Sequence, residues 1–216
     1  MVGKLAFIIL AYLLTGAAPA LAQSTPLLQE GAPPRFDLIS RQEGLSNLSV
    51  SSIVQDSRGF LWFGTQGGLN RYDGRQMTVY RHDPFDSNTI PHDLIQTIYY
   101  QESEERLWLG TYNGLSSFDL RSGTFRNVAA GEEGLSNSVV ISVISDSSGM
   151  IWVGSMGGLD RLNPETGEIT HYSVPGDVVR SLHVDGEGTL WVGSYTGLYT
   201  VDTETANRDP RTLRKV

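Results

Sequence analysis

The chain has 216 residues, of which 24 are acidic and 16 are basic, and its formal net charge is −8. Its two lysines are Lys4 and Lys215, so no basic stripe runs along the sequence between them, and binding to a nucleic-acid backbone is not expected. Cysteine is absent, which excludes disulfides and thiolate metal sites and leaves the fold to depend on its own packed core.

Residues 1–22 have the pattern of a secretory signal peptide. Lys4 precedes an apolar run over residues 5–14, and Ala20 and Ala22 form the small-x-small pattern of a cleavage site. The run is shorter than the roughly 20 residues that cross a bilayer. An uncleaved N-terminal anchor is the alternative. The sequence predicts export, a mature N-terminus at Gln23 and a linker over residues 23–35.

Four copies of one phrase occupy most of the remaining chain. Each copy contains one of the four tryptophans, and successive tryptophans are 46, 44 and 39 residues apart. The copies are LWFGTQGGLNRYD (61–73), LWLGTYNGLSSFD (107–119), IWVGSMGGLDRLN (151–163) and LWVGSYTGLYTVD (190–202). A period of about 40–50 residues with one aromatic signature per unit is typical of β-propeller blades.

Turn residues divide each unit into four expected strands. In the first unit, Asp56 and Gly59 predict a tight turn between a strand over residues 50–55 and the tryptophan strand over 60–65. Gly68, six residues after Trp62, has a counterpart in every unit and marks a second hairpin turn. A third strand over 69–73 and a fourth near 78–81 complete the unit.

We therefore expect an all-β fold over residues 36–202, built from about four blades of four antiparallel strands. Each tryptophan should pack between neighbouring blades, because a sheet covered on both faces carries apolar residues on both. The second unit has Glu105 where its sisters have glycine, and we expect a longer, more polar turn there over residues 101–106.

The two ends of the array differ from its middle. RFDLISRQEGLSN (35–47) matches TFRNVAAGEEGLSN (124–137), which predicts an outer strand over residues 36–39 with no blade before it. Residues 203–216 lack an apolar fourth strand and form a degenerate, basic tail. We expect these blades to be part of a larger ring, with a closed four-bladed ring as the alternative. Uncovered blade edges would favour self-association.

Trp-x-Gly-Thr/Ser-x-x-Gly-Leu, preceded by Asp-x-x-Gly and by Gly-Leu-Ser-Asn, resembles the two-component regulator propeller repeat, most clearly over residues 44–74. The resemblance implies a periplasmic sensor region of an inner-membrane receptor. It also implies a small ligand, such as a glycan fragment, and an output through a histidine kinase or a diguanylate cyclase. Kinase activity is not carried to any residue here, because no ATP-binding motif is present.

No residue pattern predicts catalysis, a metal site or a cofactor. The four histidines have no metal-type spacing, and the Asp-x-x-Gly acids recur in every unit, as turn residues would. A catalytic carboxylate pair would need to occur only once. We therefore expect no enzymatic activity in this chain. The alternative is a free-standing exported propeller that acts as an interaction scaffold or a polysaccharide-active enzyme.

Ligand contacts are expected where the repeats differ from one another. The positions before the recurring glycine vary, lie at hairpin tips and include Tyr, Gln and Asn, which suit sugar recognition. The loop over residues 82–92 has lid-like length, and His183 replaces an apolar residue and could face a central channel. Plain surface variation is the alternative for any one position. The candidate ligand-binding residues are Gln66, Tyr112, Asn113, Met156, Tyr195 and His183.

Overall fold

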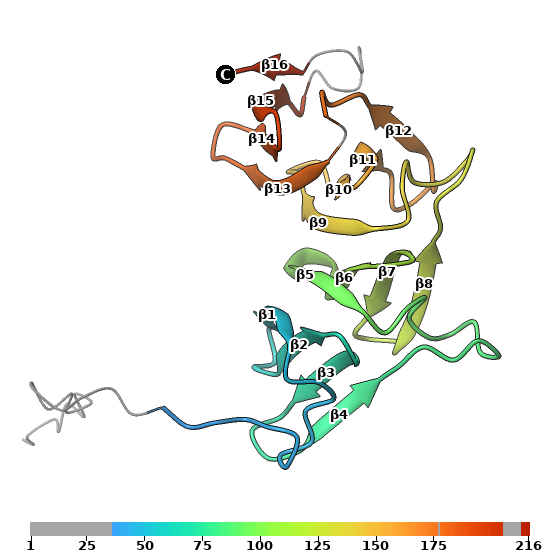
Figure 1. Ribbon diagram of the computed structural model, residues 1–216, viewed down its shortest axis with the longest axis vertical. Coiled ribbons are helices and arrows are strands. Elements are labelled where there is room, and N and C mark those ends of the chain that lie inside the picture. The colour runs from blue at the N-terminus through green and yellow to red at the C-terminus, as the bar shows by residue number, and fades with distance from the viewer. Residues whose placement is uncertain (1–35, 177, 205–212) are drawn as a thin grey trace, which may run out of the picture. The chain divides into compact units, whose positions relative to one another are not determined.

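The strands form four separate four-stranded antiparallel sheets (Figure 1) in a computed structural model that describes residues 36–176, 178–204 and 213–216. Each sheet is one blade, which confirms the all-β propeller prediction. Blade 1 consists of β1 (Val50–Gln55), β2 (Leu61–Thr65), β3 (Gly68–Tyr72) and β4 (Met77–Tyr80). Blade 2 consists of β5 (Ile95–Gln101), β6 (Arg106–Thr111), β7 (Gly114–Asp119) and β8 (Thr124–Val128).

Blade 3 consists of β9 (Val140–Ser145), β10 (Ile151–Ser155), β11 (Gly158–Leu162) and β12 (Ile169–Tyr172). Blade 4 consists of β13 (Val179–Val184), β14 (Thr189–Ser194), β15 (Gly197–Asp202) and the short β16 (Arg214–Lys215). All four blades belong to one compact unit, Leu38–Val216. The expected signal peptide, 1–22, and linker, 23–35, lie outside the described residues.

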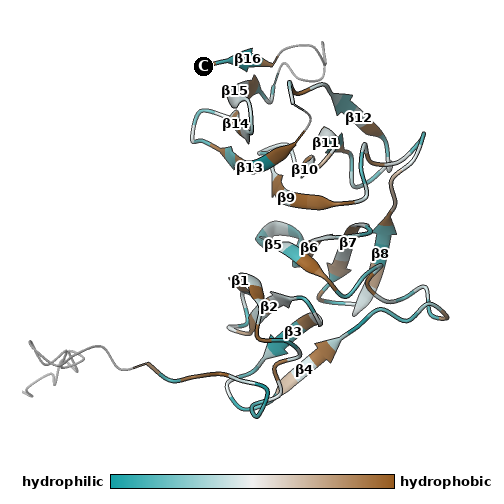
Figure 2. Ribbon diagram, in the orientation of Figure 1, coloured by the Kyte–Doolittle hydropathy of each residue, from teal (hydrophilic) through white to brown (hydrophobic). Residues whose placement is uncertain are grey.

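The first strands of successive blades lie beside one another. β1 contacts β5, β5 contacts β9 and β9 contacts β13, while the fourth strands lie on the outer side of the blades (Figure 1). No comparable contact joins β13 back to β1 within the described strands, so the four blades are not closed into a ring. Hydrophobic residues gather on the strands, whereas the connection between β4 and β5 is mostly hydrophilic (Figure 2).

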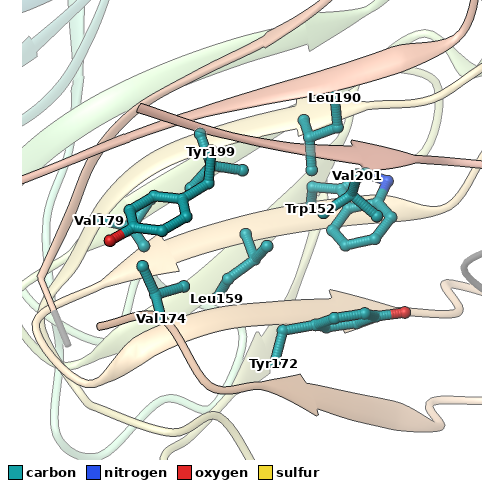
Figure 3. Close-up of a cluster of buried hydrophobic side chains, with 9 residues drawn as sticks. Trp152, Leu159, Tyr172, Val174, Val179, Leu190, Tyr199 and Val201 are labelled. Carbon is teal, nitrogen blue, oxygen red and sulfur yellow. The ribbon is translucent and has the colours of Figure 1, made fainter. Parts of the chain in front are cut away.

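Each of the first three tryptophans packs against the blade that follows it. Trp62 shares a buried cluster with residues of β5, Trp108 shares one with residues of β9, and Trp152 shares one with residues of β13 and β14 (Figure 3). Trp191 has no following blade in the described part of the chain and is only partly buried. The prediction that tryptophans fill the space between blades is confirmed for the first three.

The recurring aspartate has a second role that its turn pattern does not reveal. Asp56 Oδ1 accepts the backbone N–H groups of Arg58 and Phe60, which is the expected turn cap. Its other oxygen, Oδ2, accepts the indole N–H of Trp62 at 2.9 Å. Trp152 donates to Asp146 and Trp191 to Asp185 in the same way. One carboxylate therefore fixes both the turn and the orientation of the buried indole.

The turn of blade 2 is shorter than its sisters, so the expectation of a longer turn was wrong. Glu102–Glu104 form a 3-10 helix, and Glu105 adopts the left-handed conformation, at φ 47°, that glycine adopts in the other blades. The pairing Gln101↔Arg106 encloses one residue fewer than Gln55↔Leu61. Trp108 consequently donates its indole N–H to Gln101 Oε1 at 2.9 Å, and Glu102 has no such role.

Both ends of the array correct the expectations drawn from the sequence. Residues 36–39 form no strand, and Phe36 and Leu38 are exposed. The fourth strand of blade 4 is β16. β16 pairs with β15 through Tyr199↔Lys215, so the polar tail does supply a fourth strand. The remaining tail, residues 205–212, lies outside the described part.

The glycine two residues after each tryptophan marks the closest approach of one blade to the next. A Cβ on Gly154 would lie 2.6 Å from Val179 Cγ1 of blade 4, and Gly64 and Gly110 are approached at 2.8 Å by Ile95 and Val140. These distances are too short for a side chain. The glycine is therefore required in blades 1 to 3 by packing against the next blade, and in blades 3 and 4 Ser142 or Ser181 of the same blade also blocks a side chain there.

Gly154→Ala should lower the free energy of unfolding by about 1–3 kcal/mol, because the added methyl group must displace both Ser142 of its own blade and Val179 of blade 4. Gly186→Ala is the matched control, since a Cβ there meets nothing within 4 Å. That variant should be neutral or more stable by about 0.4–1 kcal/mol. Urea unfolding followed by tryptophan fluorescence measures both. Equal stability of the two variants would contradict the close-packed boundary.

Candidate functional site

The hairpin tips between the second and third strands share one end of the blades with the loops that lead into the first strands. The backbone N–H of Gln66 donates to the Ser49 carbonyl, that of Tyr112 to Leu94, and that of Met156 to Val139. In blade 4 the Thr196 hydroxyl donates to the Pro175 carbonyl. We call this end the hairpin rim; it comprises residues 44–49, 66–67, 81–94, 112–113, 130–139, 156–157, 173–176 and 195–196.

Five of the six candidate residues are exposed on the hairpin rim. The Tyr112 ring lies 6.1 Å from that of His92, and the Asn113 amide donates to the Pro91 carbonyl at 3.5 Å. The Tyr195 ring lies under the Arg180 guanidinium at 5.7 Å. Gln66 and Met156 are exposed at the tips of blades 1 and 3. On the same framework, the tips of blades 2 and 4 thus present tyrosine where those of blades 1 and 3 present glutamine and methionine.

His183 is separated from the other five candidates. It lies near the end of β13, paired with Trp191, and its side chain is exposed. That end of the strand leads into the turn of Asp185. The hydrogen bond from the Trp191 indole is the main cause that lowers the pKa of Asp185, and the charge of His183 is a minor one. His183 therefore belongs with the turn residues at the opposite end of the blade.

The long loop over residues 82–92 is tied to its surroundings. Asn88 Oδ1 accepts the backbone N–H of Phe125 at 2.7 Å, and Asn127 Nδ2 donates to the Thr89 carbonyl at 2.9 Å. Ile90 is fully buried in the core. A cavity of about 420 Å3 remains between this loop and Asn113. These bonds to β8 make the loop a fixed wall of the hairpin rim rather than a free lid.

Blade 3 contains a Ser–Asp–His cluster that the sequence did not predict. Buried Asp160 accepts the Ser136 backbone N–H at 2.9 Å and the Ser136 hydroxyl, and its Oδ1 lies 2.7 Å from His171 Nδ1. Ser136 Oγ also faces Nδ1, at 3.0 Å. A catalytic triad needs the serine and the acid on opposite nitrogens. The cluster therefore anchors the lead-in loop.

The same position of another blade also carries a polar residue that binds the lead-in loop. Asp160 stands eight residues after its tryptophan, where blade 1 has Asn70, and Asn70 Oδ1 likewise accepts the Ser46 N–H at 2.9 Å. A polar residue at this buried position binds the lead-in loop in both blades. Among the described residues, no group of three or more histidine, cysteine or acidic side chains could hold a metal ion.

The family model for the two-component regulator propeller matches residues 44–67 and 173–196. Each match spans a lead-in loop, the first two strands and a hairpin tip, in blades 1 and 4. This chain carries two-component regulator propeller repeats. The chain is also 50% identical over 48 residues to Histidine kinase P4 of Formosa agariphila, a match that covers 22% of this chain and 4% of the kinase.

Solved structures of similar fold include two extracellular domains from B. thetaiotaomicron. That of a putative hybrid two component system has a TM-score of 0.73 at 24% identity and covers 83% of this chain and 26% of its own. That of a putative one component system has a TM-score of 0.64 at 25% identity and covers 86% and 23%. This chain thus spans about a quarter of the length of each.

A third solved structure shows that the fold also occurs in an enzyme. Virginiamycin B lyase from Staphylococcus aureus has a TM-score of 0.59 at 13% identity and covers 72% of this chain and 53% of its own. At that identity the likeness concerns the fold alone. Within the part of the chain that the structure describes, there is no helix with the length and apolar character needed to span a membrane.

Proposed function

We propose that this chain is a ligand-binding part of an extracytoplasmic sensor, and that it binds a small ligand such as a glycan fragment on the hairpin rim. The observation that carries the proposal is the combination of a repeated framework with differing exposed side chains at its tips. Tyr112 and Tyr195 offer ring faces, and Gln66 and Asn113 offer amide donors and acceptors. Such groups suit hydroxylated ligands.

The comparisons support an output through signalling domains outside this chain. The 48-residue match is to a histidine kinase, and the solved structures of similar fold are extracellular domains of putative two component and one component systems. From this analogy we propose that the chain lies in the periplasm, within a receptor held in the inner membrane. The predicted export signal at residues 1–22 agrees with that location.

Tyr112→Ala should weaken binding of an oligosaccharide by about tenfold or more, because it removes an exposed ring that can stack on a sugar. An array of neutral oligosaccharides probed with the labelled full chain identifies the ligand, and equilibrium dialysis measures its affinity. Gln66→Ala, on the hairpin rim, should also weaken binding. Gln76→Ala changes an exposed glutamine outside that rim and is the matched control.

Two results would contradict the proposal. One is an array on which no oligosaccharide binds, and the other is an affinity that Tyr112→Ala and Gln66→Ala leave as unchanged as Gln76→Ala does. The enzymatic alternative is tested on the same material. New reducing ends released from a polysaccharide by the chain would favour a polysaccharide-active enzyme.

A further inference from the structure

The chain enters blade 1 along the same path by which it leaves blade 2 for blade 3. After β8, the backbone N–H of Leu135 donates to the Ala129 carbonyl at 2.9 Å. After residues 36–39, which we call the FDLI segment, the N–H of Leu45 donates to the Ser40 carbonyl at 3.2 Å. Both turns contain the sequence Gly-Leu-Ser-Asn. The turn that follows the FDLI segment is thus the turn that follows a fourth strand.

The two lead-in loops are also fixed to their blades in the same way. Asn70 Oδ1 accepts the Ser46 N–H at 2.9 Å in blade 1, and Asp160 accepts the Ser136 N–H at 2.9 Å in blade 3. A blade seated before blade 1, as blade 2 is seated before blade 3, would therefore have its fourth-strand position at the FDLI segment.

The FDLI segment carries the apolar residues of a fourth strand but leaves them uncovered. Phe36 aligns with Phe125, and Ile39 aligns with Val128. In β8 these two counterparts pack, partly buried, against the core clusters. Phe36 is 87% exposed and Leu38 is 81% exposed. Apolar side chains that an equivalent segment covers favour pairing with another strand.

In blade 4, the fourth strand covers less of the third strand than in the other blades. β16 pairs with β15 at two positions, Tyr199↔Lys215 and Thr200↔Arg214. Four or five residues of the fourth strand pair in each of the other blades. Both residues of β16 are exposed and basic. β15 is therefore the third strand from which a fourth strand is most easily displaced.

The register of blade 2 shows where the FDLI segment would lie on β15. Val128, with which Ile39 aligns, pairs with Leu115. Leu198 holds the position of Leu115 in blade 4, because each of them pairs with the glycine of the tryptophan strand. Ile39 would thus lie opposite Leu198, which is 42% exposed. Such a cross-strand apolar pair stabilises a sheet.

We infer that the FDLI segment of one copy of this chain replaces β16 as the fourth strand of blade 4 in another copy. Because the four blades of one copy are not closed into a ring, the partner is a second copy. Phe36 takes the place of Leu213, opposite Val201, and its aromatic ring covers more apolar surface there. The interface does not depend on the ligand proposed for the hairpin rim.

The absence of cysteine makes this exchange measurable by disulfide cross-linking. Arg126 pairs with Ser117 in blade 2, so Asp37, which aligns with Arg126, should pair with Thr200 in blade 4. Full chains that carry Asp37→Cys or Thr200→Cys are mixed and oxidised with glutathione disulfide. A size tag on the Thr200→Cys chain separates mixed dimers from dimers of one variant with itself.

The matched control replaces Thr200→Cys by Ser117→Cys, which holds the same position in a blade whose fourth strand stays in place. The mixture with Thr200→Cys should give about tenfold or more mixed dimer than the control, because a disulfide requires Cα atoms within about 7 Å. Leu213→Asp, added to the Thr200→Cys chain, should raise the yield, since it weakens the competing β16.

Phe36→Asp, added to the Asp37→Cys chain, should lower the yield, because it places a charge in the new strand. Phe85→Asp, in the exposed loop between β4 and β5, should leave it unchanged. Three results would overturn the inference. They are equal yields with Thr200→Cys and Ser117→Cys, a yield that Phe36→Asp leaves as unchanged as Phe85→Asp does, and a yield that Leu213→Asp lowers. Copies that associate without this cross-link would pack through their end blades without exchanging a strand.

Discussion

Alanine in place of Trp62, Trp108 or Trp152 should lower the free energy of unfolding by about 3–5 kcal/mol each. Each of these indoles is buried against the next blade, so its removal leaves a cavity at a boundary between blades. The loss also leaves an acceptor without its donor, Asp56, Gln101 or Asp146. A buried acceptor without a partner adds to the cost.

Trp191→Ala should cost less than the other three, because Trp191 is only partly buried. Thermal unfolding of all four variants, followed by circular dichroism, measures the difference. Tyr195→Ala, an aromatic truncation at an exposed tip, is the control and should change stability by about 0.5 kcal/mol at most. Equal tolerance of alanine at all four tryptophans would contradict the packing of each indole against a following blade.

Trp152→Phe separates the two contributions. Phenylalanine keeps most of the buried ring but cannot donate to Asp146, which lies within 3.6 Å of Arg161 and is buried. The loss should therefore be smaller than for Trp152→Ala. It should still be measurable, at about 1–3 kcal/mol, because the carboxylate loses its indole donor.

The repeated phrase predicts the strands well because each recurring residue has a local cause. The expected strand over residues 50–55 is β1, and the expected strand over 60–65 differs from β2 by one residue. Gly68 has a φ of 119°, a value that favours glycine, so the second hairpin turn follows from the residue type alone. Alignment of the chain with itself was sufficient for these elements.

Features that depend on pairing between distant segments could not be predicted in this way. The turn between β5 and β6 encloses one residue fewer than its counterpart in blade 1, and the acceptor of the Trp108 indole is Gln101 instead of Glu102. Ser136 and Asp160 meet only when the lead-in loop folds onto β11. For the candidate site, the sequence located the hairpin tips on one rim, because their positions follow from the recurring turn residues.

The two end blades should associate with each other across copies of this chain. Leu198 of blade 4 is 42% exposed, whereas its counterparts Leu69, Leu115 and Leu159 are fully buried. On blade 1, Ile53 is 60% exposed, whereas Ile98, which holds the same register position in β5, is 5% exposed. Each end therefore presents an apolar face that the inner blades bury, and such faces favour pairing.

The two faces are complementary rather than alike. In the inner boundaries, the first apolar residue of each inner strand fits over the glycine of the preceding blade, as Val179 fits over Gly154. Val50 is the corresponding residue of blade 1 and is exposed, and Gly193 of blade 4 has no residue of a following blade within 4 Å. We therefore expect Val50 of one copy to pack over Gly193 of another. A head-to-tail contact of this kind need not close, so we expect assemblies of several sizes.

Analytical ultracentrifugation of a chain over residues 23–216 should accordingly show a mass that rises with protein concentration. Ile53→Asp or Leu198→Asp should shift the distribution toward monomer, because each places a charge on one of the two end faces. Phe85→Asp is the matched control, since Phe85 is exposed in the loop between β4 and β5 and lies on neither face. Addition of further blades of the same repeat type after residue 216 should also suppress association, because they would cover Leu198 as blades 2, 3 and 4 cover Leu69, Leu115 and Leu159. A monomer at every concentration, or association that all three variants leave unchanged, would contradict head-to-tail packing of the end blades.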